Sequence, residues 1–248
     1  VEPLVGAPDG LPALATAVVA LSFLMIDASG SGSLYVALAV LAVLLVRLLG
    51  VPRPSALALG LTLGAAWALA YQAVLLLPIP LLALLLAAPR GARRAAWRTG
   101  LAAITVAALV QVPWWWRNTQ AFGDPFYSVN RCYVLLHAGI QPTLSLASGW
   151  PEARFPEVAG VGWFLKGLKG WGPGNALYLL VSGLVVWPGL LGLVAAGAAS
   201  GFAEARRAHD RRVLAALLLL AAFGGIALLW PGTKLRYLVP MTPLVVLL

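Results

Sequence analysis

The sequence has little charge and few of the side chains that bind metals or form disulfides. Of its 248 residues, 10% are charged and 61% are hydrophobic, and the mean hydropathy is +0.92. A soluble domain carries about 25% charged residues, so this shortage predicts an all-α protein that crosses a membrane several times. The single cysteine, Cys132, excludes an intrachain disulfide. His137 has no partner at metal-ligand spacing, so we predict neither a metal site nor a cofactor.

Several functional motifs are also missing. The sequence has no Walker A loop, no Gly-x-Ser-x-Gly element and no His-Glu-x-x-His pair. Almost no ionisable residue falls inside an apolar run, whereas ion-coupled transporters and proton pumps need such residues within the membrane. The sequence starts at Val1 without a methionine or signal peptide and stops at Leu248 in an apolar run. We therefore expect an internal or C-terminal fragment of a longer protein.

Eight apolar runs approach membrane-spanning length, given that a span needs roughly 17–25 residues. They cover residues 11–26, 34–50, 55–70, 73–88, 99–116, 176–198, 213–230 and 237 to the end. The stretch 56–88 is too long for one span. Tyr71 and Gln72, followed by Pro78 and Pro80, predict that it breaks into two closely joined helices.

The positive charges are grouped, and the grouping predicts an orientation. Three connections hold 10 of the 17 Lys and Arg residues: Arg47 and Arg53; Arg90, Arg93, Arg94 and Arg98; and Arg206, Arg207, Arg211 and Arg212. Alternation of eight spans puts all three on one side, which the positive-inside rule makes cytoplasmic. The net charge of +9 is thus explained by topology, and we expect no nucleic-acid partner. The whole chain, 1–248, is predicted to be one polytopic transmembrane domain.

The stretch Pro113–Phe126 is typical of the edge of a membrane. An apolar run leads to Pro113, three tryptophans follow, and Arg117, Asn118 and a Gly-Asp-Pro turn complete it. Tryptophan collects where hydrocarbon meets headgroups, because its ring is apolar and its N–H needs a polar partner. We expect the residues before Pro113 to lie in lipid and those after Arg117 to lie in water or at the interface.

The long connection 117–173 falls on the predicted extracytoplasmic side. Within it, the segment 163–171 has tryptophan, phenylalanine and leucine on one helical side, with Lys166 and Lys169 on the other. This pattern predicts a short helix lying on the membrane surface. A basic loop with scattered tryptophans is the alternative.

Two glycines at helical spacing lie in the run 55–70. Gly60 and Gly64 match the GxxxG pattern, which lets two helix backbones approach closely. In a chain with 26 glycines this spacing is not specific. We expect it to serve packing within the chain rather than dimerisation.

Polar side chains that could bind a ligand gather on the predicted outer side. A guanidinium at Arg117 can bind a phosphate bidentately, while the Asn118 amide holds a hydroxyl or a backbone group. The alternative for Arg117 is an anchor that reaches the headgroups. Lys234 and Arg236, followed by Tyr237, enter the last span from outside. An anionic ligand such as a lipid phosphate would explain this placement, and simple anchoring is the alternative.

Two carboxylates on this side are weaker candidates. Asp27 lies in a Gly/Ser-rich connection, where it could face an external cavity as a general base; a solvated turn residue is the favoured interpretation. Asp124 stands between Gly123 and Pro125. That order is turn chemistry, so we expect a structural role for it.

The order of these motifs resembles one known family. Val112–Asn118, with the sequence V-P-W-W-W-R-N, and Phe122–Tyr127, with F-G-D-P-F-Y, are similar to the signature P-W-x-x-R-N followed by F-G-N/D-P-F. That signature belongs to polytopic GT-C glycosyltransferases, bacterial relatives of protein O-mannosyltransferases and of the aminoarabinose transferase that modifies lipid A. The glycine-bearing segment 58–78 and Lys234–Pro240 are similar to further family elements. The resemblance spans roughly residues 11–248.

The resemblance implies a function and a location. Such enzymes transfer a sugar from a polyprenyl-phosphate carrier to a glycan, lipid or protein acceptor, on the extracytoplasmic face of the plasma (inner) membrane. By resemblance, Arg117 and Asn118 lie at the outer rim of the active-site cavity. Lys234 and Arg236, beside Tyr237, lie near the carrier phosphate, where charge-assisted contacts stabilise it as it leaves.

The sequence departs from the family in three places. The first external loop, which carries the family's catalytic carboxylate, would lie upstream of Val1, so we expect the fragment alone to be inactive. Gly32–Tyr35 lacks the acidic residue that many members have, and Ala70–Gln72 lacks their cation. A lipid-linked sugar flippase or other polytopic transporter is the alternative function, and a noncatalytic membrane scaffold is a third.

Overall fold

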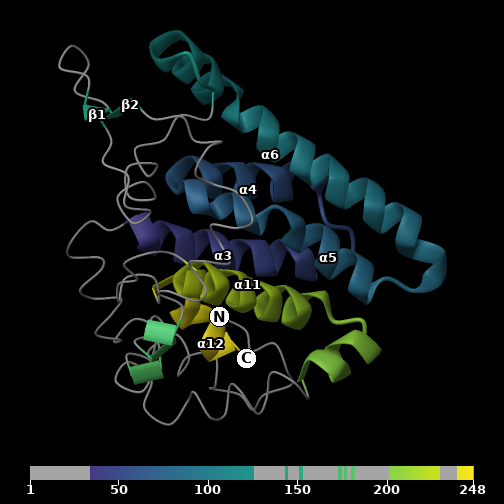
Figure 1. Ribbon diagram of the computed structural model, residues 1–248. Helices are drawn as coiled ribbons and strands as arrows, with labels where there is room; N and C mark the ends of the chain where they lie inside the picture. The colour runs from purple at the N-terminus through teal and green to yellow at the C-terminus, as the bar shows by residue number, and fades with distance from the viewer. Residues whose placement is uncertain are drawn as a thin grey trace.

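The computed structural model describes residues 34–125, 143–144, 151–152, 173–174, 176–177, 180–181, 201–229 and 239–247. These residues are almost entirely helical, as the sequence predicts (Figure 1). The α-helices are α3 (Leu34–Gly50), α4 (Ala56–Leu69), α5 (Pro78–Ala87), α6 (Arg93–Phe122), α11 (Arg211–Leu229) and α12 (Thr242–Leu247). The 3-10 helices η1 (Tyr71–Leu76) and η2 (Arg90–Ala92) precede α5 and α6, and β1 (Thr143–Leu144) pairs antiparallel with β2 (Pro151–Glu152).

The helix boundaries follow local sequence. Ser55 is the N-cap of α4, and its side-chain oxygen accepts a hydrogen bond from the N–H of Ala58 at 3.3 Å. Helix α4 ends at Leu69, and α5 starts with Pro78 in its first turn, where the missing N–H costs nothing. The predicted division of 56–88 into two closely joined helices is therefore confirmed, with η1 between them.

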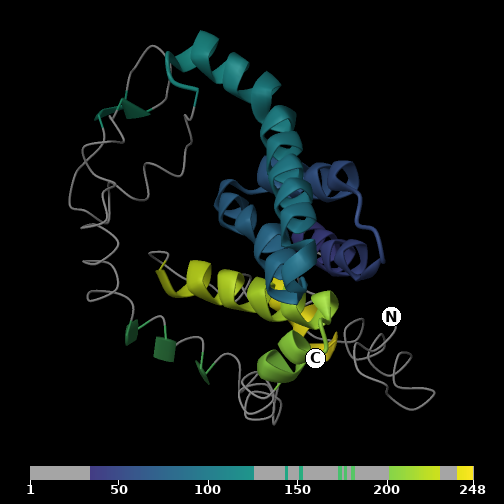
Figure 2. The ribbon, with the colours of Figure 1, turned by 90° about the vertical axis from the view of Figure 1, so that its right-hand side faces the viewer.

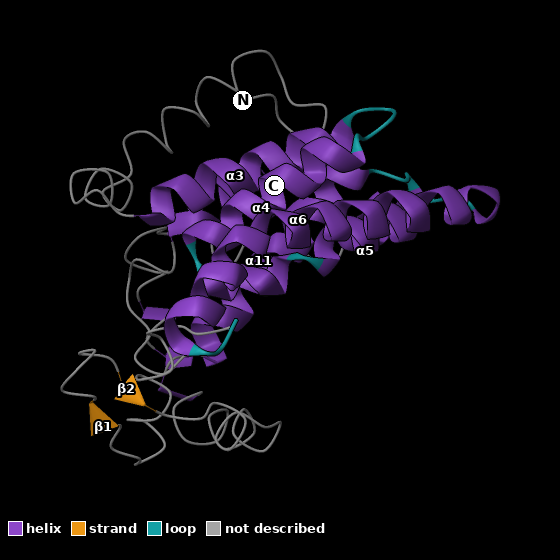
Figure 3. Ribbon diagram, turned by 90° about the horizontal axis from the view of Figure 1, so that it is seen from above, coloured by secondary structure: helices purple, strands orange, loops and turns teal. Residues whose placement is uncertain are grey.

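The described helices pack side by side. Helix α6 packs on α4 and α5, α3 packs on α4, and α11 packs on α3 and α5. Figure 1 shows this order from α6 at the top to α11 and α12 below, and Figure 2 shows α6 extending beyond its neighbours. Figure 3 shows that helices make up nearly all of the described structure. Large aliphatic side chains in the core include Leu45, Leu49, Leu59, Leu63, Leu214 and Leu219.

The α4–α6 interface depends on the two glycines of the GxxxG spacing. A Cβ added to Gly60 would lie 2.7 Å from the carbonyl oxygen of Ala103 and would also clash with Val106. A Cβ added to Gly64 would lie 2.7 Å from the Cβ of Val110. Both values are shorter than real side-chain contacts, so the two helices approach as they do because no Cβ is present there. The prediction that this spacing serves packing within the chain is confirmed.

The start of α11 lies against the connection between α3 and α4. The Nη2 group of Arg211 donates a hydrogen bond to the carbonyl oxygen of Pro52 at 3.4 Å. The aliphatic part of Arg212 lies against Gly50, the last residue of α3, where any Cβ would overlap it. The C-terminal end of α3 and the N-terminal end of α11 therefore lie at the same end of the bundle.

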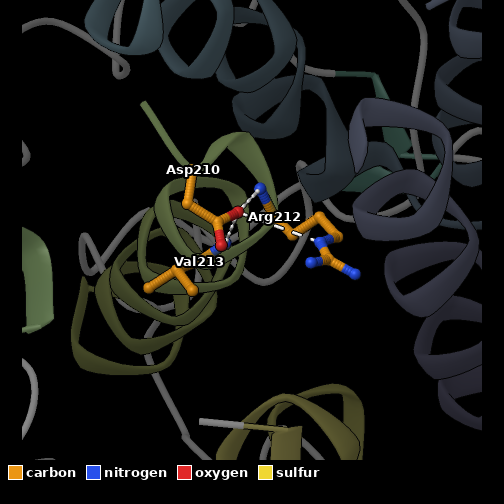
Figure 4. A network of polar contacts seen from close by, with 3 residues as sticks. All are labelled: Asp210, Arg212 and Val213. Carbon is orange, nitrogen blue, oxygen red and sulfur yellow. Dashed lines mark hydrogen bonds and ion pairs between the residues drawn. The ribbon is translucent and has the colours of Figure 1, made fainter. Parts of the chain in front are cut away.

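The corner before α11 brings the end of α5 to the same place. Asp210 accepts hydrogen bonds from the N–H groups of Arg212 (2.9 Å) and Val213 (3.4 Å), which satisfies donors of the first turn (Figure 4). Its carboxylate also lies 3.9 Å from the Nε of Arg212. His209 has a left-handed φ of 58°, and its Nδ1 lies 2.6 Å from the carbonyl oxygen of Ala87.

These contacts gather most of the described positive charge at one end. Ten of the eleven Lys and Arg residues in the described ranges belong to the three connections that meet there, and only Arg117 lies at the other end. The ten, called the basic end below, are Arg47, Arg53, Arg90, Arg93, Arg94, Arg98, Arg206, Arg207, Arg211 and Arg212. The predicted clustering of the three connections on one side agrees with this arrangement.

The predicted number of spans is not established. Within the described residues, the segment Arg90–Phe122 is long and apolar enough to cross a membrane, whereas Leu34–Gly50, Ala56–Leu69 and Ala73–Ala87 form shorter apolar helices. The run 11–26 and most of 176–198 lie outside the described residues. At the C-terminal end, α12 begins at Thr242, after a 3-10 turn over 239–241. The described structure is thus almost entirely helical, and eight spans stay a prediction.

Candidate functional site at the C-terminal end of helix α6

Helix α6 continues through Pro113 and ends at Phe122, six residues beyond the predicted end of this span at 116. The proline removes one backbone donor but does not stop the helix, as is common in membrane helices. The hydroxyl of Thr119 donates to the carbonyl oxygen of Trp115 at 2.8 Å, a local bond compatible with helical backbone. Residues 117–122 therefore prolong the helix instead of starting the loop. Figure 2 shows α6 curving toward this end.

The three tryptophans point in different directions because successive residues of a helix are about 100° apart. Trp115 is partly buried, and its ring meets that of Trp67 on α4 edge to face, with the centroids 5.6 Å apart and the planes at 72°. Trp114 and Trp116 are 54% and 69% exposed. One tryptophan therefore fixes α6 on α4, while the other two present their rings to the surroundings.

Arg117 is exposed and lies over an aromatic face. Its guanidinium carbon is 4.9 Å from the ring centroid of Trp114, one helical turn earlier. This is a cation–π arrangement, which orients the guanidinium while leaving its N–H groups able to donate to an anion. The predicted position of Arg117, just beyond the tryptophans, is thus held by a defined contact.

Asn118 is buried, not exposed like Arg117. Its side chain is 1% exposed, and its Nδ2 donates a hydrogen bond to the carbonyl oxygen of Pro125 at 3.3 Å. Gly123 ends the helix with a left-handed φ of 69°, and its N–H donates a hydrogen bond to the carbonyl oxygen of Thr119 at 2.9 Å. The amide therefore holds the turn against the helix end. The turn predicted around Asp124 is present, and the substrate-binding role predicted for Asn118 stays a prediction.

A small apolar cavity lies at the same end of the bundle. It has a volume of about 20 Å³ and is lined by Tyr35 and Leu38 of α3, Ala70 just before η1, Ala73 of η1, Phe223 and Ile226 of α11, and Pro240. This volume accommodates roughly one water-sized group. Ala70 follows α4 three residues after Trp67, which contacts α6. The cavity therefore lies at the end of the bundle opposite the basic end.

The other predicted site residues lie outside the described residues. They are Asp27, Lys234, Arg236 and Tyr237, and the same is true of Cys132, His137 and the predicted surface helix 163–171. Of the predicted site residues, the structure therefore describes Arg117, which is exposed, and Asn118, which is buried. Among the described residues, no group of three or more His, Cys, Asp or Glu side chains comes together to hold a metal.

Two contacts beside this site were not predicted from the sequence: one hydrogen bond from a polar side chain and one pair of aromatic rings. Gln111 is 3% exposed, and its Nε2 donates to the carbonyl oxygen of Gly64 at 2.8 Å. The sequence does indicate a contact of this kind, because a glutamine within an apolar run needs a hydrogen-bond partner. The pairing of Trp67 with Trp115 had no such signal, since either ring could equally have faced outward.

The site is an exposed cation on an aromatic face, next to a turn that a buried amide holds. Such an arrangement can bind a phosphate or carboxylate at its rim. No family model, curated protein or solved structure matches the chain.

Proposed function

We propose that the chain is part of a polytopic membrane glycosyltransferase that moves a sugar from a polyprenyl-phosphate carrier to an acceptor on the extracytoplasmic face. The observation that carries the proposal is the placement of Arg117. This cation lies on the Trp114 ring, beside the Gly-Asp-Pro turn and at the end of the bundle opposite the basic end. The sequence motif around it resembles that of the GT-C family.

The surface of α6 supports a membrane location. Its buried face carries mostly small residues: Ala96, Gly100, Ala103, Ala107, Gln111 and Asn118. Its exposed face carries large apolar residues: Trp97, Leu101, Leu109, Val112, Trp114 and Trp116. A soluble helix has the reverse distribution, because water favours burial of the large apolar side chains. Small residues inside and large ones outside are typical of a helix whose surroundings are lipid.

The tryptophans of α6 support the same location by their spacing. Trp97 lies near the basic end, and Trp114 and Trp116 follow 17 and 19 residues later. At 1.5 Å per residue these separations correspond to about 26 and 28 Å along the axis. The hydrocarbon core of a bilayer is about 30 Å thick, and tryptophan concentrates at both of its borders. Arg117 would then stand at the outer border.

The proposed roles differ between the two neighbouring residues. Arg117 binds the carrier phosphate or an adjacent oxyanion and stabilises the charge that develops on the leaving group. Asn118 acts indirectly, because its hydrogen bond to Pro125 positions the turn beside that cation. Lys234 and Arg236, with Tyr237, complete the phosphate contacts in this proposal.

The test uses the full-length gene product in proteoliposomes with a labelled polyprenyl-phosphate sugar. Arg117→Ala should lower kcat/KM about 10- to 100-fold, because a hydrogen bond to a charged group contributes about 1.5–3 kcal/mol. Arg117→Lys should restore part of the loss. Arg53→Ala, which removes an exposed cation at the other end of the bundle, is the matched control. Equal transfer by Arg117→Ala and by the control would refute the site.

The same vesicles separate the transferase from the transporter. A flippase moves the intact lipid-linked sugar between leaflets and releases no free carrier phosphate, whereas transfer produces the carrier and a glycosylated acceptor in equal amounts. Movement of the intact lipid without cleavage of its sugar–phosphate bond would favour the transporter and overturn the proposal.

A further inference from the structure

The basic end has far more cations than acids. Its ten arginines face two carboxylates in the described residues, Glu204 and Asp210, and among these residues the structure records one ion pair there, between Asp210 and Arg212. Arg211 uses its side chain on the carbonyl oxygen of Pro52. The large excess of positive charge is therefore not neutralised within the described part of the chain, which favours an anionic partner.

The first turns of α6 present this charge together with an aromatic ring. Arg93, Arg94 and Arg98 are exposed, Trp97 between them is 47% exposed, and the first turn has no acidic residue. At about 100° per residue, these four side chains occupy one sector of about 140° around the helix. Arg90 precedes them in η2 and is also exposed. We call these five residues the arginine–tryptophan cluster.

We propose that the arginine–tryptophan cluster binds the headgroups of anionic phospholipids in the leaflet at the basic end. The inference rests on the membrane location given under the proposed function. Guanidinium groups donate bidentate hydrogen bonds to phosphate oxygens, while the indole of Trp97 fits the border of headgroups and hydrocarbon. A zwitterionic lipid offers the same phosphate but cancels its charge, so selectivity for net negative lipids follows from the excess of arginines.

The fold keeps the cluster near the other cations. His209 ties the end of α5 to the start of α11, and only Ala88 and Pro89 separate α5 from η2. The arginines just before α11 and in its first turn, and those of the α3–α4 connection, are therefore at the same end as Arg93 and Arg94. A lipid surface can engage all of them at once, which a single small anion cannot do.

The experiment measures thermal unfolding and retained lipid for the full chain in detergent. An anionic phospholipid at about a hundredfold excess over its Kd should raise the Tm by about 5–10 °C, and a zwitterionic phospholipid at the same concentration should not. The triple variant Arg93→Gln, Arg94→Gln and Arg98→Gln should bind the anionic lipid about 100-fold more weakly. Its charge-conserving counterpart with three lysines should retain most of the binding.

Further arms separate the possible sources of the anion. Gln120→Ala, an exposed position near the opposite end of the same helix, is the control for lipid binding and should bind as the unchanged chain does. Inorganic phosphate or a single-stranded oligonucleotide that gives the same Tm increase as the anionic lipid would overturn the assignment. So would equal stabilisation of the triple glutamine variant and the unchanged chain.

Failure of the lipid-binding inference and failure of the proposed function give different experimental results. The lipid measurements use no sugar donor, so transferase activity does not influence them. A chain that resists extraction from membranes at high pH but shows no preference for anionic lipid overturns the lipid site alone. A chain that alkaline extraction removes from the membrane overturns the proposed function as well.

Discussion

The contact between α4 and α6 gives the sharpest test of the packing. Replacement of Gly60 by alanine puts a methyl group 2.7 Å from the carbonyl oxygen of Ala103, and that backbone atom cannot rotate away. Overpacking of this kind costs about 1–3 kcal/mol. Alanine also has a helix propensity about 1 kcal/mol more favourable than that of glycine. The control must therefore also replace a helical glycine by alanine.

Gly225 provides that control. It lies within α11, and a Cβ added there meets nothing within 4 Å. Gly225→Ala should therefore be as stable as the unchanged chain or more stable. Gly60→Ala should be less stable than Gly225→Ala by about 1–3 kcal/mol, which is the overpacking cost. For a chain of this size the difference corresponds to a Tm lower by about 2–12 °C. Far-UV circular dichroism in detergent measures both unfolding transitions.

The neighbouring glycine allows a double-mutant cycle. All three of the nearest atoms that a Cβ on Gly64 would meet belong to the side chain of Val110. Gly64→Ala should destabilise the chain, and Val110→Gly should restore space for the new methyl group. We expect the pair to be coupled by about 0.5–3 kcal/mol. Additive effects in this cycle, together with equal melting of Gly60→Ala and Gly225→Ala, would refute the described approach of α4 and α6.

Three further predictions concern single polar contacts. Asn118→Ala should lower the stability by about 1–2 kcal/mol and speed proteolysis at the turn after Phe122, and exposed Gln120→Ala should do neither. Gln111→Leu removes the hydrogen bond to α4 and should cost about 0.6–1.7 kcal/mol, measured by unfolding in detergent; unchanged stability would show that this bond contributes nothing. His209→Ala and His209→Gly both lose the hydrogen bond to α5, but only glycine relieves the strain of the left-handed backbone at this position. The glycine variant should therefore be more stable than the alanine variant by about 1 kcal/mol. The reverse order of the two Tm values in thermal melts would contradict the left-handed backbone at residue 209.

Local features of the sequence predicted the helices well. Apolar runs at 34–50 and 55–70 became α3 and α4, because helix propensity and burial act over a few neighbouring residues. Pro78 and the polar pair Tyr71-Gln72 divided the next stretch as predicted, since proline lacks an N–H whatever surrounds it. The grouping of arginines likewise predicted which helix ends lie together, because successive helices alternate in direction along the chain.

The end of α6 shows where local signals mislead. Pro113 and the tryptophans suggested that the helix stops near 116, but it runs to Phe122. The proline removes a single donor, and the residues that follow tolerate helical backbone until Gly123 adopts a positive φ. A helix end is decided by which residue stops hydrogen bonding. Glycine signalled that position better than the change from apolar to polar residues.

The sequence by itself determined that this chain is helical, apolar and charged asymmetrically, because composition and spacing carry those properties. Only the tertiary structure decided that Arg117 and Asn118 differ in burial and in the residues they contact. One is exposed on Trp114, while the other is buried against Pro125. It also decided that Gly60 meets Ala103. Partners across space depend on how helices approach one another, and the identity of a residue fixes what contacts it can make but not which neighbour provides them.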